Sequence, residues 1–146
     1  MLKEIKPFLE EAGWYKGRRI EIDYMLSDFS REEYKEPNHL MKELFSEFWN
    51  IKVKRVTPEG FYQDIRLNTD EGMGSTSSDT MSQLERLVGI DFLPVGTIND
   101  DHAVLLLSFE AKFYLFADAG LFFLGDSISK ACKKVLFRED LIKIAG

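Results

Sequence analysis

The sequence has little of what metal centres and redox sites are built from. Its 146 residues include one cysteine, Cys132, and two histidines, His39 and His102. A single cysteine cannot form an internal disulfide, which is typical of a reducing compartment. No apolar run approaches the ~18 residues of a membrane helix, and the charged start MLKEIKPFLEE lacks the apolar stretch of a signal peptide. We therefore expect a cytoplasmic protein that uses no membrane and no metal.

Positive charge is scarce in the middle of the chain. The net charge is −6, and residues 58–126 carry twelve acidic against three basic side chains. An acidic domain repels phosphate backbones, so we expect no nucleic-acid binding. The bases Lys52, Lys54 and Arg55 are interpreted as a solvated strand face rather than a nucleic-acid patch. A basic partner protein is compatible with this balance.

Four segments have the apolar spacing of amphipathic helices. The first runs from Leu2 to Ala12, and Pro7 predicts that it starts late or bends. The others are 40–48 with Asn38 as N-cap, 81–88 opened by Asp79 or Thr80, and 128–136 capped by Asp126 or Ser127.

The remaining apolar segments predict strands. Residues 51–57 and 61–67 flank a Pro-Glu-Gly turn and predict a hairpin, and four further strands follow between 92 and 125. The run 103–109 is apolar on both faces, which predicts a central strand covered by helices. Residues 18–26 are ambiguous between strand and loop, and the glycine- and serine-rich residues 68–80 predict a mobile surface loop. We expect one α+β domain over residues 1–146, with an antiparallel twisted sheet of about six strands and helices packed at its side.

The strongest candidate for catalysis is the run Asn99-Asp100-Asp101-His102, with Asp118 on a facing strand. Carboxylates beside an imidazole could bind a metal or carry out acid–base chemistry, and a small hydrolase is one hypothesis. Adjacent residues point in different directions, however, and this composition is typical of a solvated turn. We therefore expect no enzyme activity and no cofactor.

The stretch AGWYKGRR, residues 12–19, combines glycine, aromatic and arginine side chains. Such a combination can form a ligand loop or tie a helix end to the core. We interpret Trp14 as a buried aromatic, and Arg18 or Arg19 as the donor that satisfies buried carbonyls or an acid.

Several short motifs occur together in a recognisable order. They are AGW at 12–14, GR at 17–18, LVG at 87–89, PVG at 94–96 and GDSISKACKKVL at 125–136. Together they resemble the third group of the SUKH immunity superfamily over nearly the whole chain. The sequence departs from the relatives at two turns, because it has Phe48-Trp49-Asn50-Ile51 in place of FGGL and Glu110-Ala111 in place of a glycine turn.

The resemblance implies a bacterial immunity protein with a small twisted sheet and helices at its side. Such proteins bind a cognate polymorphic toxin, often a nuclease or deaminase, without catalysis, cofactor or metal. The resemblance also implies structural roles for Trp14, Arg18, Pro94 and Gly96. A regulatory interaction module outside a toxin system is the alternative, and the oligomeric state is not predicted.

Four acids are predicted to face the toxin: Asp70 and Glu71 in the loop 68–80, and Asp100 and Asp101 in a turn. Exposed acids add little to stability and repel one another. A basic nuclease gives them a use, because complementary charge raises the association rate.

Overall fold

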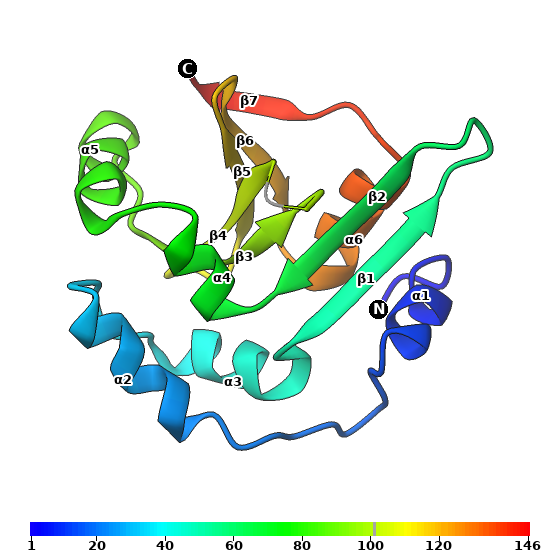
Figure 1. Ribbon diagram of the computed structural model, residues 1–146, viewed down its shortest axis with the longest axis horizontal. Helices are drawn as coiled ribbons and strands as arrows, with labels where there is room; N and C mark the ends of the chain where they lie inside the picture. The colour runs from blue at the N-terminus through cyan, green and yellow to red at the C-terminus, as the bar shows by residue number, and fades with distance from the viewer. Residues whose placement is uncertain (101) are drawn as a thin grey trace.

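The computed structural model of the chain describes residues 1–100 and 102–146, which form six helices and seven strands (Figure 1). The helices are α1 (Lys6–Glu11), α2 (Asp23–Arg31), α3 (His39–Phe48), α4 (Thr69–Gly74), α5 (Ser78–Val88) and α6 (Ile128–Leu136). The strands are β1 (Ile51–Val56), β2 (Tyr62–Leu67), β3 (Phe92–Ile98), β4 (Ala103–Ser108), β5 (Phe113–Ala117), β6 (Gly120–Gly125) and β7 (Ile142–Ala145). None of the helices in this part of the chain is long and apolar enough to cross a membrane.

The strands form a single antiparallel sheet in which each strand pairs with the next one along the chain, from β1 to β7. This confirms the predicted α+β class and the predicted hairpin, in which Val56 pairs with Tyr62. The sheet has seven strands rather than about six. The additional strand is β7, whose four residues pair with β6 and expose Ile142 and Ile144.

Helices cover both faces of the sheet. The larger apolar core joins α1, α2, α3 and α6 to one face, and α6 contacts β1 and β2 as well as β5 and β6. A smaller core joins Met81 and Leu84 of α5 to Phe92, Leu106 and other side chains of the opposite face. Strand β4 lies in the middle of the sheet, and all six of its residues are buried. The prediction of a central strand covered by helices is therefore confirmed.

Two of the predicted helix caps are confirmed. Asn38 caps α3 by accepting a hydrogen bond from the backbone N–H of Met41 (3.0 Å), and Ser127 caps α6 through Lys130 (3.2 Å). The third is wrong, because α5 is capped by Ser77, which accepts from the backbone N–H of Thr80 (3.1 Å), and not by Asp79 or Thr80. Helix α1 begins only at Lys6, with Pro7 in its first turn, where the missing N–H of proline leaves no hydrogen bond unmade.

The interpretation of residues 68–80 as a mobile loop is wrong. Asn68 caps α4, in which Thr69, Gly72 and Met73 are buried, and Ser77 caps α5. A Cβ atom on Gly72 would lie 2.6 Å from the backbone nitrogen of Gly96, so this glycine lets α4 approach β3 closely. The glycine is therefore a packing residue here and does not end the helix.

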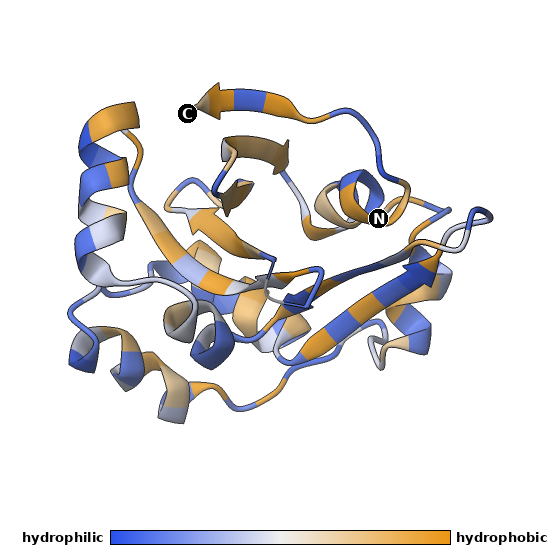
Figure 2. Ribbon diagram, turned by 45° about the horizontal axis from the view of Figure 1, so that its top comes forward, coloured by the Kyte–Doolittle hydropathy of each residue, from blue (hydrophilic) through white to orange (hydrophobic). Residues whose placement is uncertain are grey.

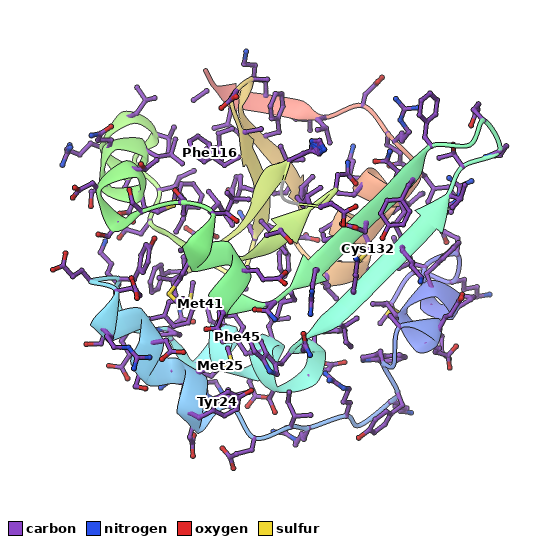
Figure 3. The ribbon with its side chains drawn as sticks, in the orientation of Figure 1. Tyr24, Met25, Met41, Phe45, Phe116 and Cys132 are labelled. Carbon is purple, nitrogen blue, oxygen red and sulfur yellow. The ribbon has the colours of Figure 1, made fainter. Side chains whose placement is uncertain are left out.

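The ambiguous segment 18–26 becomes an extended stretch followed by α2, which begins at Asp23. Figure 3 shows Met25 on α2 and Met41 and Phe45 on α3 gathered between the two helices, and all three are fully buried. Tyr24, the neighbour of Met25, points outward and is 60% exposed. One buried residue per turn is enough to fix α2 on the core, although its N-terminal end carries no side-chain cap.

Candidate protein-interaction surface

The hairpin β1–β2 turns one face to solvent, and the residues on it are set by strand register. Lys52 pairs with Arg66, Lys54 with Asp64, and Val56 with Tyr62. Paired residues point to the same side of a sheet. The alternating residues Ile51 and Val53 are buried on the other side, and Figure 2 shows this alternation of hydrophobic and hydrophilic residues along β1. We call the solvent side, with Lys52, Lys54, Val56, Tyr62, Asp64 and Arg66, the β1–β2 outer face.

A buried carboxylate lies at the centre of this face. Asp64 is 1% exposed, and its Oδ2 lies 3.7 Å from Nζ of Lys52. The same ammonium lies 3.5 Å from Oδ1 of Asp100, whose backbone N–H donates to Asp64 Oδ1 (3.3 Å). Burial lowers the pKa of Lys52, but a hydrogen bond with Tyr62 and the charges of Tyr62, Asp64 and Asp100 outweigh this and raise it. Lys52 is therefore held as a cation between two acids.

The turn between β3 and β4 supports this arrangement. Asn99 and Asp100 have φ of 53° and 52°, a left-handed conformation that Asn and Asp tolerate better than other side chains. The Asn99 side chain accepts from the Asp64 backbone N–H (2.9 Å) and donates to Gln63 (2.9 Å). The turn is thus fastened to β2, which fixes the position of the Asp100 carboxylate.

The second predicted acid on this face is Glu71, in the first turn of α4. Its Oε1 accepts from Nη1 of Arg66 (2.8 Å), and Nη2 of Arg66 donates to Asn50 (3.0 Å). Because Arg66 and Lys52 are register partners, Glu71 and Asp100 belong to the same surface although they come from different elements. The sequence offered no sign of Arg66 or Asp64 as part of it.

The other two predicted acids do not join them. Asp70 is exposed and lines a groove with Asp28, Arg31 and Glu32 of the α2 end. Asp101 lies outside the described residues. The predicted acids are therefore divided between two surfaces, and on the outer face each of the two is paired with a base.

The stretch AGWYKGRR lies against the C-terminal end of α3. Trp14 is 8% exposed, and its Nε1 donates to Glu47 Oε2 (2.9 Å). The guanidinium of Arg18 donates from Nη1 to the carbonyl oxygen of Glu47 and from Nη2 to that of Trp49 (2.8 Å). The last carbonyls of a helix have no partner within it, so Arg18 supplies donors that α3 lacks.

Pro94 and Gly96 lie together at an irregularity of β3. The register with β4 shifts between them, which indicates a β-bulge, a position where a strand tolerates proline. A Cβ atom on Gly96 would lie far inside contact distance of the Arg66 carbonyl oxygen. Glycine is therefore required where β3 meets β2.

Of the residues weighed for catalysis, Asp101 lies outside the described part of the chain, and the described ones are not assembled into a site. His102 and Asp118 are exposed, and among the described residues no group of three His, Cys, Asp or Glu side chains is placed to hold a metal ion. Cys132 lies fully buried on α6, and burial raises the pKa of its thiol to about 12. A thiol in this environment stays protonated at neutral pH and is a poor nucleophile.

Comparison with known proteins shows to which family the chain belongs. The model of the SUKH-3 immunity protein family matches residues 1–137. The chain belongs to the SUKH-3 immunity protein family. Searches among curated proteins and among solved structures found no significant match. The SUKH-3 match ends just after α6, so β7 lies beyond it.

The two departures from the SUKH-3 pattern have a common structural feature. Asn50 and Ala111 have φ of 60° and 64°, in the left-handed region that favours glycine. They occupy the two turns where the resemblance leads one to expect glycine. Both turns therefore adopt the left-handed conformation without glycine, the residue that adopts it most easily.

Proposed function

We propose that this protein binds and neutralises a cognate polymorphic toxin in the bacterial cytoplasm, through protein–protein contact and without catalysis, cofactor or metal. The observation that carries the proposal is the SUKH-3 immunity family match over residues 1–137. We further propose that the toxin acts on nucleic acid, because a protein that grips phosphates presents the basic surface that an acidic partner complements.

The β1–β2 outer face supports a toxin contact of mixed charge. Asp100 is 65% exposed at its side chain, and Lys52 retains Asp64 as a second partner. A Lys or Arg of the toxin can therefore take the place of Lys52 at Asp100 without leaving a buried charge unpaired. Glu71, 38% exposed beside Arg66, is also accessible to a cation of the toxin, and Arg66 would then keep its hydrogen bond to Asn50 but no acidic partner. Alternating charge of this kind favours specificity more than raw affinity.

Asp70 and Asp101 belong to the proposal as further toxin-facing acids. Asp70 stands in the first turn of α4, directly before Glu71. Its groove with α2 is a separate surface, so its contribution has to be tested separately from that of Glu71 and Asp100.

The test requires a toxin gene beside the gene for this chain and uses the toxin domain that such a gene encodes. Co-expression should restore growth, and the purified proteins should associate at a rate that falls with salt. The double substitution Glu71→Gln with Asp100→Asn removes two charges and keeps the side-chain shapes, and Asn also tolerates the left-handed φ of position 100. We expect slower association and a weaker dependence on salt.

Stability has to be monitored in the same variants. Exposed ion pairs contribute about 0–1 kcal/mol, so the melting temperature should change little. The matched control is Glu10→Gln with Asp118→Asn, two exposed acids on other surfaces. Equal association of both double variants would remove Glu71 and Asp100 from the binding face, and a wild-type protein that neither binds nor protects would refute the proposed function itself.

A further inference from the structure

A groove of about 390 Å³ lies between α3, the turn from β4 to β5 and the start of α6. Its apolar lining includes Met1 together with Leu40, Leu44, Phe48, Ala111, Phe113 and Ile128. Leu40, Leu44 and Phe48 recur every four residues on α3, and side chains with this spacing lie on one face of a helix. The same helix directs Met41 and Phe45 into the core. Phe48, Phe113 and Ile128 of the groove lining also belong to the core, whereas Leu40 is 53% exposed.

Acidic residues of α3, next to its apolar groove residues, make the groove negatively charged. Glu43 and Glu47 line it from α3, and Asp126 lines it from the residue before the α6 cap. These three carboxylates are the charged side chains of the lining. Arg19, which pairs with Glu43, and Lys130, which pairs with Asp126, lie outside the lining, and their side chains are 73% and 56% exposed.

The N-terminal stretch AGWYKGRR supports one wall of this groove from behind. Phe48, which lines it, stacks on Trp14 with ring centroids 6.4 Å apart and planes 12° apart. The indole N–H of Trp14 holds the carboxylate of Glu47, and Arg18 holds its carbonyl oxygen. The acid at this wall is therefore fixed in place before any partner arrives.

We infer that this groove docks a segment of the toxin that presents a large apolar side chain flanked by Lys or Arg. The inference rests on the proposed function and names a second contact besides the β1–β2 outer face. An apolar floor with a carboxylate rim is complementary to that chemistry, since the side chain fills the hollow while the cations meet Glu43, Glu47 and Asp126.

A second copy of the chain fits the groove less well. The exposed basic and apolar residues of the hairpin, Lys54, Val56 and Phe61, have the required chemistry but form a different patch of the molecule. A contact between two different patches is head-to-tail, and it leaves one of each free to bind the next copy. Such contacts join copies into chains or rings. A toxin segment, in contrast, occupies one groove and leaves no further patch for another copy.

The peptide experiment does not depend on knowing the toxin. The full-length protein is titrated with a capped peptide of sequence RLKFR, and backbone amide shifts are followed by NMR. We expect the shifts to cluster at Leu40, Leu44, Ala111 and Ile128. A peptide ELEFE with the same apolar residues and a peptide RSKSR with the same charges should each bind much more weakly. Equal shifts with ELEFE, or unmoved groove amides with RLKFR, would overturn the inference.

Two variants separate the contributions of the apolar lining and of the acidic lining to peptide binding. Leu40, 53% exposed, is replaced in Leu40→Ser, with Leu87→Ser on α5 as control because Leu87 is 71% exposed and lies outside the groove. We expect about tenfold weaker RLKFR binding for Leu40→Ser, as for the loss of one buried leucine, and no change for the control. Glu43→Gln with Asp126→Asn should flatten the salt dependence.

The toxin itself separates this inference from the proposed function. If the toxin binds wild type and Leu40→Ser equally, the groove is not its docking site and the immunity function stands. If wild type fails to bind the toxin while RLKFR still occupies the groove, the proposed function fails. Concentration-dependent self-association of wild type that Leu40→Ser abolishes would assign the groove to a second copy and overturn the inference.

Discussion

Trp14 provides the sharpest test of how the N-terminal stretch is used. Its side chain is 8% exposed, stacks on Phe48 and donates to Glu47. Replacing a packed Trp by Ala costs about 3–5 kcal/mol, because apolar contacts are lost and a cavity remains. Trp14→Phe keeps most of the ring contact and removes the N–H bond to a charged group, which is worth about 1.5–3 kcal/mol. The two variants therefore separate packing from hydrogen bonding.

The assay is urea and thermal unfolding at neutral pH. For a chain of about 150 residues, 1 kcal/mol shifts the melting temperature by about 2–4 °C. We expect Trp14→Ala to lose roughly 10 °C or more and Trp14→Phe to lose about half as much. Tyr15→Ala is the matched control, because Tyr15 is the adjacent aromatic and is 58% exposed.

The contrary result is a Trp14→Ala protein as stable as Tyr15→Ala. Stability would then not depend on the indole, and the contacts with Phe48 and Glu47 would have another purpose. Loss of RLKFR binding in such a stable variant would assign Trp14 to the docking groove. If Trp14→Ala loses stability but still binds RLKFR at low temperature, residues 12–19 have a structural role and do not contribute to binding.

Two further predictions concern single positions. Ala111 has φ of 64°, so Ala111→Gly relieves backbone strain of about 1 kcal/mol, and the added flexibility of the unfolded chain offsets about 0.4–1 kcal/mol of this. Calorimetry should therefore show a rise in melting temperature of at most about 2 °C. A lower melting temperature would contradict the left-handed turn. Cys132 is fully buried with its pKa raised to about 12, so iodoacetamide at neutral pH should label it only in denaturant, and rapid native labelling would contradict its burial.

Helices and strands with strong local signals could be predicted from the sequence. The caps Asn38 and Ser127, the hairpin at Pro58–Gly60 and the buried strand β4 each depend on neighbouring residues or on one unbroken pattern. Local chemistry is enough in these places because capping and alternation act within a few residues.

The elements that the sequence analysis missed depend on distant partners. Helix α4 contains two glycines, and its packing requires one of them because Gly72 meets Gly96 across the interface with β3. Helix α2 is fixed by contacts of Met25 and Phe29 with the core rather than by a cap. Strand β7 has only four residues, three of them exposed, so its sequence carries no pattern of buried and exposed positions from which a strand could be predicted. In each case tertiary contacts override weak local preference.

The charge of the two candidate surfaces could not be predicted from the sequence either, because it also depends on distant partners. Residues 58–126 hold twelve acids and three bases, which predicts an acidic surface, but residues 1–57 supply bases that reach into it. Lys52 meets Asp64 and Asp100, and Lys35 lies 2.8 Å from Asp91. Meanwhile the carboxylates of the groove come from Glu43 and Glu47 in one part of the chain and Asp126 in another. Charge counted along a sequence thus becomes charge on a surface only after strand register and helix packing have distributed it. The acid-rimmed groove could therefore not be found by counting acids, whereas the balanced outer face looked acidic until Lys52 and Arg66 were placed on it.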